Sequence, residues 1–422
     1  MTTATVIGVV GAGSMGAGIA QLAALRGHHV VLADAFAAPL ARARTAHEKG
    51  MQREVDKGRL DQDAADEALR RISYVEGAAS GALGALAGCG VVVEAVIEDL
   101  AAKREIFGSL EGVVDAGAIL ATNTSSLSVA ALASACKRPE RVVGVHFFNP
   151  APVMPLVEIV PAIGTDPAVT EAARALVTRW GKTAVTATDT PGFIVNRVAR
   201  PFYGESLRML EEGVADCATI DRALRDLGGF RMGPFELMDL IGNDVNFAVT
   251  VSVFESMFHD PRYRPSITQQ RMVEAGLFGR KSGRGYYSYT ADGRQIGPDG
   301  RPSGASPSAS MLAVGRPSGG VQMPEDPAAL ARDHAIVNRV VAMLVNEAVD
   351  AVRLRIASPI DIELAMTRGV NYPKGLLAWG DEIGPAKVLG TLEALQTEYG
   401  EDRYRPSPLL RRVARTGKRL LE

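Results

Sequence analysis

Short apolar runs, each followed by a stretch with helical spacing, dominate the first half of this 422-residue chain. Thr5 to Val10 is typical of a buried strand, and Ile19, Leu22, Ala23 and Leu25 then recur on one face of a helix. His29 to Asp34 predicts a second strand, which ends in an acidic residue. The three elements together form a βαβ unit of about 30 residues.

Further strands are expected along the same half of the chain. They are predicted at 91–96, 118–121, 142–146, 156–160 and 183–186, while the stretch from Pro39 to Tyr74 is helical in composition. Strands that alternate with helices pair in parallel, with helices on both faces of the sheet. We therefore expect an α/β domain over residues 1–188, doubly wound around a mostly parallel sheet.

The pattern changes after Pro191-Gly192, where the alternation of strands and helices stops. Apolar residues then follow a helical period, which predicts an all-α domain over residues 189–289. Residues 290–330 are rich in Gly, Pro and Ser without a periodic apolar face and indicate a linker. A second helical domain is expected over 331–422.

The two helical domains look like copies of one another. Ile194-Val195-Asn196-Arg197 recurs as Ile336-Val337-Asn338-Arg339, an offset of 142 residues (338 minus 196). The run Arg262 to Ser266 returns as Arg403 to Ser407, and the offset there is 141 (403 minus 262). A match this long with a one-residue slip indicates a duplication, and each copy is expected to bury its apolar face against the other.

Composition excludes several classes of protein. The formal net charge of -2 provides no global field that would attract nucleic acid or a membrane surface. The three cysteines lack CxxC spacing, which argues against a disulfide framework and a zinc site and favours the reducing cytoplasm. The uncharged run from Ala4 to Leu25 has no basic segment before it and contains turn glycines, so we interpret it as neither a signal segment nor a membrane span.

The turn after the first strand carries the first chemical signal, in Gly11-Ala12-Gly13-Ser14-Met15-Gly16. Gly11 permits the tight bend, Gly13 lets the backbone approach a pyrophosphate, and Gly16 allows close packing of helix and strand. The helix N-terminus supplies N–H donors. Because Asp34 ends the second strand, it is expected to bind the ribose hydroxyls and to favour NAD over NADP, the alternative being a solvated acid.

A second signal lies in the strands at 142–146 and 156–160, where His146 ends one strand and Glu158 sits inside the next. Neighbouring strands could bring the two side chains within hydrogen-bond reach. A histidine held by a buried carboxylate has a fixed tautomer and suits removal of a proton from an alcohol. The alternative, a core histidine satisfied by a structural acid, fits the spacing equally well.

Several motifs in order resemble those of the L-3-hydroxyacyl-CoA dehydrogenase family. They are Val143-Gly-Val-His146-Phe-Phe-Asn149-Pro-Ala-Pro, Asn123-Thr-Ser125-Ser, Asp189-Thr-Pro-Gly192-Phe-Ile-Val-Asn196-Arg197 and Met232-Gly-Pro-Phe-Glu-Leu-Met-Asp239. The similarity runs from about Thr5 to Tyr289. The duplicated helical domain resembles the longer bacterial 3-hydroxybutyryl-CoA or 3-hydroxyadipyl-CoA dehydrogenases, of fatty-acid β-oxidation or phenylacetate degradation.

The resemblance implies roles for individual residues in the NAD-dependent, reversible oxidation of (S)-3-hydroxyacyl-CoA to 3-oxoacyl-CoA. His146 would be the general base and Glu158 its supporting acid, while Ser125 and Asn196 would contact the substrate, Ser125 also lying near the nicotinamide. Further cofactor contacts would come from Glu98, Lys103, Asn149 and Lys281. For each of these, the alternative is a surface charge or a helix cap.

Coenzyme A brings phosphates that need basic partners. Six basic residues between Arg42 and Arg59 could supply them, with Lys57 nearest to a family contact, although a solvated helix face is the favoured interpretation for most of the six. No metal is expected. The second repeat lacks a counterpart of Phe278-Gly-Arg-Lys281-Ser-Gly, so we interpret it as structural, making the chain an internal pseudo-dimer; a homodimer is the alternative.

Two other functions remain open from the sequence. The first is a sugar-acid dehydrogenase on the same scaffold, like the lambda-crystallin relatives, which would need no coenzyme A contacts. The second is a non-catalytic nucleotide-binding protein, which predicts a damaged site, whereas Ser125, His146, Glu158 and Asn196 are all present. Acyl-chain length and a terminal carboxylate on the substrate are not encoded in any motif that we can place.

Overall fold

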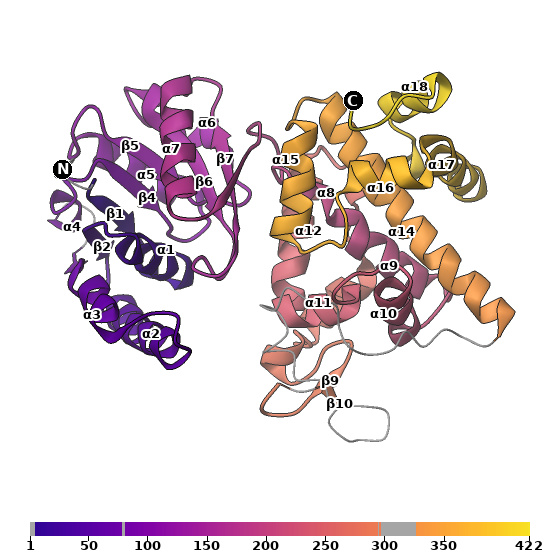
Figure 1. Ribbon diagram of the computed structural model, residues 1–422, viewed down its shortest axis with the longest axis horizontal. Helices are drawn as coiled ribbons and strands as arrows, with labels where there is room; N and C mark the ends of the chain where they lie inside the picture. The colour runs from indigo at the N-terminus through magenta and orange to yellow at the C-terminus, as the bar shows by residue number, and fades with distance from the viewer. Residues whose placement is uncertain (1–4, 78–80, 294, 297–325) are drawn as a thin grey trace. The chain divides into compact units, whose positions relative to one another are not determined.

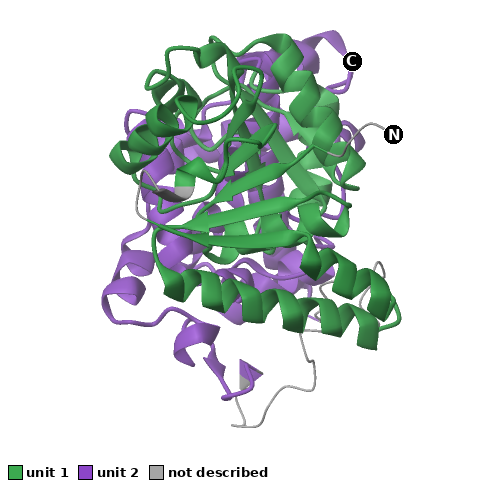
Figure 2. Ribbon diagram, turned by 90° about the vertical axis from the view of Figure 1, so that its left-hand side faces the viewer, with its two compact units in different colours: residues 1–194, 356–369 green, residues 195–355, 370–422 purple. Residues whose placement is uncertain are grey.

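The chain forms two compact units in the computed structural model, which describes residues 5–77, 81–293, 295–296 and 326–422. Unit 1 comprises Met1–Ile194 and Ile356–Gly369, and unit 2 comprises Val195–Arg355 and Val370–Glu422 (Figure 2). The two helical repeats that the sequence suggests as separate domains thus share one compact unit. A short segment of the second repeat belongs to unit 1 instead.

Unit 1 is built on an eight-stranded sheet in the order β3-β2-β1-β4-β5-β6-β7-β8 (Figure 1). The strands are β1 (Ile7–Val10), β2 (Val30–Asp34), β3 (Ile72–Glu76), β4 (Val91–Glu94), β5 (Ile119–Thr122), β6 (Val142–Phe147), β7 (Leu156–Pro161) and β8 (Thr183–Thr186). All neighbouring pairs are parallel except β6 with β7. This is the mostly parallel, doubly wound sheet that the sequence predicts.

Helices follow the strands because apolar residues on both faces of a parallel sheet must be covered. They are α1 (Ser14–Leu25), α2 (Ala37–Asp56), α3 (Gln62–Arg70), α4 (Gly81–Gly84), α5 (Leu100–Glu111), α6 (Val129–Ala133), η1 (Pro139–Arg141) and α7 (Pro167–Arg179). One core cluster joins α1 and α7 to Val9, Val93 and Val145 of the sheet. On the other face, α6 approaches β6 so closely that a Cβ on Gly144 would stand 3.0 Å from Val129.

The sequence interpretation was wrong at one strand. The stretch Pro39 to Tyr74 was expected to be helical throughout, but Ile72–Glu76 forms the edge strand β3, paired with β2. The β-branched and aromatic residues Ile72, Tyr74 and Val75 fit a pleated surface better than a helix. Local preference and pairing with β2 therefore outweigh the helical composition of the residues that precede the strand.

The segment 356–369 of the second repeat extends unit 1. It contains α15 (Pro359–Leu364) and η4 (Ala365–Gly369), which contact β8 and β7 respectively. The Thr188 N–H donates to the Ile356 carbonyl over 2.7 Å. The duplicated half of the chain therefore covers the end of the sheet that carries β7, rather than forming a domain wholly of its own.

Unit 2 is helical. Its elements are α8 (Val195–Val198), α9 (Arg200–Glu211), α10 (Cys217–Asp226), α11 (Pro234–Ile241), α12 (Asn243–Ser256), η2 (Pro261–Tyr263), α13 (Ile267–Glu274), η3 (Arg280–Ser282), α14 (Pro327–Arg353), α16 (Leu376–Ile383), α17 (Pro385–Tyr399), η5 (Asp402–Tyr404) and α18 (Pro408–Thr416). A short hairpin of β9 (Ser288–Tyr289) and β10 (Gln295–Ile296) adjoins them. The long helix α14 packs against α9, its counterpart in the first repeat.

Reciprocal ion pairs join the two repeats. Arg197 Nε donates to Glu347 Oε1 over 2.7 Å, and its counterpart Arg339 Nε donates to Glu205 Oε2 over 2.9 Å. The hydroxyls of Tyr263 and Tyr404 then reach Glu347 and Glu205 at 2.5 and 3.0 Å, respectively. This exchange is what a two-fold related pair of copies would show, and it confirms that the repeats pack on each other.

Most of the expected linker 290–330 lies outside the described residues. Its first part differs from the expectation, since Gln295–Ile296 pairs with β9. Among the residues that the structure describes, no single helix has the length and apolar composition to cross a bilayer; only α11 and α12 taken together pass, and they are bent by 100°.

Candidate active site

The glycine turn between β1 and α1 has the geometry that a phosphate-binding turn requires. Gly11 has φ +99°, and a Cβ there would stand 2.6 Å from the Ala95 carbonyl oxygen. A Cβ on Gly16 would stand 1.8 Å from the carbonyl oxygen of Gly11. Nothing lies within 4 Å of the position where Gly13 would carry a Cβ, so this glycine leaves open space in front of the helix N-terminus.

Asp34 ends β2 beside this turn. Its Oδ2 accepts from the Ala12 N–H over 2.7 Å, and its Oδ1 accepts from Phe36 N–H over 3.0 Å. The carboxylate therefore helps to shape the turn in addition to presenting an acceptor at the carboxyl edge of the sheet. This is the edge at which doubly wound sheets bind their ligands.

The loop from Phe148 to Pro155 joins β6 to β7 and reaches the same edge. Ser14 Oγ lies 3.5 Å from Oδ1 of Asn149, which brings Asn149 to the glycine turn. The Lys182 ammonium holds the loop by donating to the carbonyls of Ala151, Pro152 and Met154 at 2.7, 3.2 and 2.7 Å. Burial lowers the pKa of Lys182 to about 8, with a smaller effect of Arg26 in the same direction.

Glu98 organises the Asn-Thr-Ser-Ser loop. Its Oε1 accepts from Thr124 Oγ1 at 2.6 Å, from the N–H groups of Ser125 and Ser126 at 2.9 and 3.2 Å, and from their hydroxyls at 3.4 and 3.0 Å. Burial alone would raise the pKa of Glu98, but Lys103 and these hydrogen bonds outweigh it and bring the pKa below its usual value. Glu98 is thus a carboxylate that fixes the position of Ser125.

Lys103 is not the surface charge that was weighed as an alternative, because only 1% of its surface is exposed. Its Nζ bridges Glu98 Oε2 at 3.1 Å and Glu94 Oε1 at 2.8 Å. Glu94, which ends β4, also accepts from Thr122 Oγ1 at 2.7 Å and from Val96 N–H at 2.7 Å. A buried charge needs such partners, and any effect of this lysine on a ligand passes through Glu98.

His146 and Glu158 stand directly opposite each other in the antiparallel register of β6 and β7. His146 Nδ1 lies 2.7 Å from Glu158 Oε2, and both side chains are buried. The contact expected from the sequence is therefore present. A carboxylate at Nδ1 places the proton on that nitrogen and directs the lone pair of the neutral ring to Nε2.

The surroundings of this pair are apolar and fixed. The rings of Phe148 and Phe193 lie with their centroids 4.5 and 5.8 Å from that of His146. Glu158 Oε1 accepts from the Ile194 N–H over 3.1 Å, so the same carboxylate also holds the last residue of the first segment of unit 1. Asn123 Oδ1 accepts from the Phe147 N–H over 2.9 Å, which ties the loop bearing Ser125 to the strand bearing His146.

Unit 1 therefore brings together most of the residues that the sequence singles out: the glycine turn, Asp34, Glu98, Lys103, Ser125, His146, Asn149 and Glu158. Asn196 lies in α8 and Lys281 in η3, both in unit 2. The Lys281 ammonium lies 2.6 Å from the Asp244 carboxylate. Lys57 directly follows the last residue of α2, and its Nζ lies 4.0 Å from Glu54 Oε1. All six basic residues between Arg42 and Arg59 are exposed.

The sequence analysis assigned no role to three positioning residues. Glu94 ends an apolar strand as Asp34 does, which is a signal that could have found it. Asp189 caps α6 by accepting from Ser128 Oγ at 2.9 Å and from the N–H groups of Val129 and Ala130. Lys182 carried no local signal, because its three acceptors are backbone carbonyls some thirty residues earlier in the sequence.

The described part of the chain contains no group of three or more His, Cys, Asp and Glu side chains that could hold a metal ion. The three cysteines, Cys89, Cys136 and Cys217, are free thiols. Burial raises the pKa of the Cys89 and Cys136 thiols to about 11 and that of Cys217 to about 12. At neutral pH they are therefore protonated and weak nucleophiles.

Comparison with known families gives matches over nearly the whole chain. Residues 6–190 match the family described as "3-hydroxyacyl-CoA dehydrogenase, NAD binding domain". Residues 192–289 and, a second time, 336–419 match "3-hydroxyacyl-CoA dehydrogenase, C-terminal domain". The double match agrees with the duplication inferred from the two offsets.

Individual relatives agree with the family matches. The chain is 40% identical to the 3-hydroxyadipyl-CoA dehydrogenase of Escherichia coli K12, with 98% of each chain covered. It is 41% identical to a 3-hydroxybutyryl-CoA dehydrogenase of Bradyrhizobium diazoefficiens, over 67% of this chain and 94% of that one. A crystal structure described as 3-hydroxybutyryl-CoA dehydrogenase of Escherichia coli K12 superimposes with a TM-score of 0.85 at 39% identity, covering 98% of both chains.

Substitution of the turn glycines tests whether the open space at Gly13 receives the cofactor. Gly13→Val should fold normally, because its Cβ meets nothing within 4 Å, yet it should weaken the binding of NADH at least about tenfold by occupying the pyrophosphate position. Fluorescence titration with NADH measures the affinity, and thermal unfolding measures the stability. Gly164→Val, at a glycine that also has open space, is the matched control. Undiminished NADH affinity in Gly13→Val would contradict the assignment of the turn.

Proposed function

The chain belongs to the 3-hydroxyacyl-CoA dehydrogenase family, and on that premise we propose that His146 takes the proton of the 3-hydroxyl group while NAD oxidises the substrate. The family is one of NAD-dependent oxidoreductases that convert a hydroxyacyl-CoA into the oxo form. The observation that carries the proposal is the 2.7 Å contact between His146 Nδ1 and the buried Glu158 carboxylate.

The contact determines what the imidazole can do. With its Nδ1–H directed to Glu158, the ring presents Nε2 as the acceptor for the substrate proton. When the proton arrives, the ring becomes a cation next to a carboxylate that is already in place, so no charge has to be rearranged. The rings of Phe148 and Phe193 lie next to the imidazole and limit its movement.

In our proposal Ser125 binds the substrate oxygen, and two buried or partly buried carboxylates behind it keep Ser125 in position. Glu98 holds the Ser125 backbone through the Ser125 N–H, and on substrate binding the Ser125 hydroxyl exchanges its long 3.4 Å contact with Glu98 for a hydrogen bond that it donates to the oxygen at C3. Lys103 and Glu94 maintain the charge and position of Glu98. Asn196, two residues after the Ile194 N–H that binds Glu158, is proposed as a further substrate contact.

The cofactor fits the residues that would hold it. Gly11 to Gly16 leave room for a pyrophosphate at the N-terminus of α1, and Asp34 is placed to bind the adenosine ribose. Asn149 and Glu98 complete the proposed contacts of unit 1, and Lys281 is proposed as a contact from unit 2. When bound at these residues, NAD would supply the acceptor for the hydride from C3, and the residues described above supply alignment and charge.

For the acyl group we propose a chain that carries a terminal carboxylate, as in 3-hydroxyadipyl-CoA. The support is the relative of that name, which aligns with this chain over 98% of both and so shares the duplicated helical half. The crystal structure of equal coverage is described as 3-hydroxybutyryl-CoA dehydrogenase, which makes the four-carbon substrate the direct competitor. Lys57 and its exposed basic neighbours are proposed to meet the coenzyme A phosphates.

We further propose that the enzyme acts in the cytoplasm as a single chain. Three free cysteines fit a reducing compartment. The reciprocal pairs between Arg197 and Glu347 and between Arg339 and Glu205 supply within one chain the self-complementary interface that a dimer would otherwise form.

Removal of the proposed base tests the mechanism. His146→Gln should lower kcat for the reduction of acetoacetyl-CoA by NADH about 10²- to 10⁴-fold, because the proton transfer loses its catalyst. The affinity for NADH should change little, since the ring is not a proposed cofactor contact. His334→Gln, at an exposed histidine of α14, is the control. Unaltered turnover in His146→Gln would remove His146 from its role and leave the structural interpretation.

A panel of acyl groups decides between the two proposed substrates. We expect kcat/KM for 3-oxoadipyl-CoA to exceed that for acetoacetyl-CoA by at least about tenfold, since a matched polar partner for a terminal carboxylate gives strong discrimination. A straight-chain 3-oxohexanoyl-CoA separates chain length from charge. Equal values for the six-carbon pair would show that the carboxylate is not recognised.

The proposed single-chain state can be measured in solution. Light scattering combined with size-exclusion chromatography should give the mass of one chain, because the surface used for pairing is already covered. A wild-type dimer that dissociates when Arg264→Ala is introduced in the first repeat would contradict the internal pseudo-dimer.

A further inference from the structure

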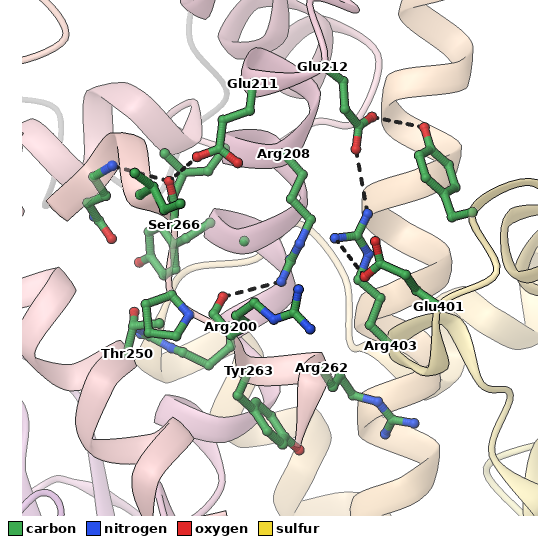
Figure 3. A pocket seen from close by; sticks show the side chains of 18 residues that line it. Arg200, Arg208, Glu211, Glu212, Thr250, Arg262, Tyr263, Ser266, Glu401 and Arg403 are labelled. Carbon is green, nitrogen blue, oxygen red and sulfur yellow. Dashed lines mark hydrogen bonds and ion pairs between the residues drawn. The ribbon is translucent and has the colours of Figure 1, made fainter. Parts of the chain in front are cut away.

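A cavity of about 400 Å³ lies within unit 2, where the two repeats meet (Figure 3). Its walls come from α9, from the segment 262–267 that follows the end of α12, and from residues around Tyr399 and Arg403 of the second repeat. The volume is in the range of sites for small molecules. All of its lining residues belong to unit 2, so it is separate from the nucleotide turn of unit 1.

The two repeats differ at three positions of the helix that lines this cavity. Successive turns of α9 present Arg200, Gly204 and Arg208 to the cavity. At the offset of 142 residues, α14 carries Ala342, Asn346 and Asp350. The same stripe of the helix is therefore Arg-Gly-Arg in one repeat and Ala-Asn-Asp in the other.

The second repeat fills the equivalent space with its own side chains. Asn346 Nδ2 donates to the Arg405 carbonyl over 3.0 Å, and Asn346 Oδ1 accepts from the Ser407 N–H over 2.7 Å. Asp350 accepts from Ser407 Oγ over 3.0 Å. Gly204 has no side chain to do this, and the Arg208 guanidinium lies over it, with Nη1 2.9 Å from the place of a Cβ.

Arg200 is a buried cation of this cavity for which the described residues supply no anionic partner. Its side chain is 7% exposed, and no carboxylate among the described residues forms an ion pair with it. Nη1 donates to Thr250 Oγ1 over 3.0 Å, but Nε has no hydrogen-bond partner within the structure. A buried guanidinium in this state is costly unless an anion joins it.

Apart from Arg264, the other charges of the lining already have partners. Arg208 pairs with Glu205 at 3.1 Å, Arg262 with Glu347 at 3.0 Å, and Arg403 with Glu401 at 3.4 Å. Of the acids, Glu212 pairs with Arg339, and Glu211 accepts from Ser266 Oγ. Arg264 is exposed at the same cavity. The lining therefore carries a surplus of positive charge centred on Arg200.

We propose that this cavity binds a small phosphate ester, of a size up to that of a mononucleotide, whose phosphate group pairs with Arg200 and Arg208. A phosphate monoester carries nearly two negative charges and three acceptor oxygens, so it can satisfy more than one guanidinium at once. The sugar or other organic part then lies against Tyr203 and the rest of the cavity wall. Because Asn346 and Asp350 fill the second position, each chain binds one such molecule.

Calorimetry on the full chain tests this site directly. With NADH present at saturation to occupy the nucleotide site of unit 1, we would titrate the enzyme with ribose 5-phosphate, with inorganic phosphate and with succinate as a dianion without phosphorus. We expect one molecule of ribose 5-phosphate per chain. We also expect binding of inorganic phosphate to be weaker, and no comparable heat with succinate.

Variants taken from the second repeat locate the binding. Gly204→Asn fills the cavity without removing a charge, and Arg200→Ala removes the unpaired cation; each should weaken ribose 5-phosphate at least about tenfold. Both introduce the residue that α14 already carries at that position, so both should fold. Arg405→Ala, the counterpart of Arg264 on the filled side, should leave the affinity unchanged.

Other outcomes would overturn the proposal. Equal affinity in the wild type, Gly204→Asn and Arg200→Ala would place the phosphate elsewhere, for instance at the coenzyme A site. Succinate that binds as tightly as ribose 5-phosphate, and that loses affinity in the same variants, would assign the cavity to carboxylates instead. Absence of any heat with all three probes would show that Arg200 is neutralised without a ligand.

Discussion

The antiparallel pairing of β6 with β7 is the constraint on which the rest of the candidate site depends. In a sheet whose other pairs are parallel, it allows two consecutive strands to meet through a loop instead of a crossover helix, and so places His146 opposite Glu158. A slip of one residue would move the carboxylate to the opposite face. The second oxygen of Glu158 binds the Ile194 N–H, so one buried group orients the base and holds the chain that leads into unit 2.

Two other buried carboxylates have the same importance for unit 2. Glu205 and Glu347 are 1% and 0% exposed, and each is satisfied by an arginine and a tyrosine of the opposite repeat. Burying such charges gains little energy over an apolar contact, whereas leaving one unpaired costs several kcal/mol. They therefore make one packing of the repeats strongly preferable to others. Arg200, Gly204 and Arg208 of α9 differ from their counterparts in α14, although the ion pairs next to them are the same in both repeats.

Local patterns predicted the features whose chemistry is local. The glycine turn, Asp34 and the strands bearing His146 and Glu158 could be identified because spacing within a βαβ unit or between adjacent strands fixes them. The burial of Lys103 and the contacts of Lys182 could not be predicted, since only the fold brings their partners near. β3 was missed because the helical composition of the residues before it masked a short edge strand, which its own residues and its pairing with β2 together decide. The cavity at Arg200 required the comparison of two repeats in three dimensions.

The duplication has a consequence for how the enzyme responds to dilution. An interface between separate subunits forms only to the extent that their concentration exceeds a dissociation constant, and the stability of such proteins is inseparable from it. Here Arg197 meets Glu347, and Arg339 meets Glu205, within one polypeptide. The effective concentration of one repeat near the other is set by the connecting chain alone. The helical unit should therefore remain assembled however little of the protein a cell makes.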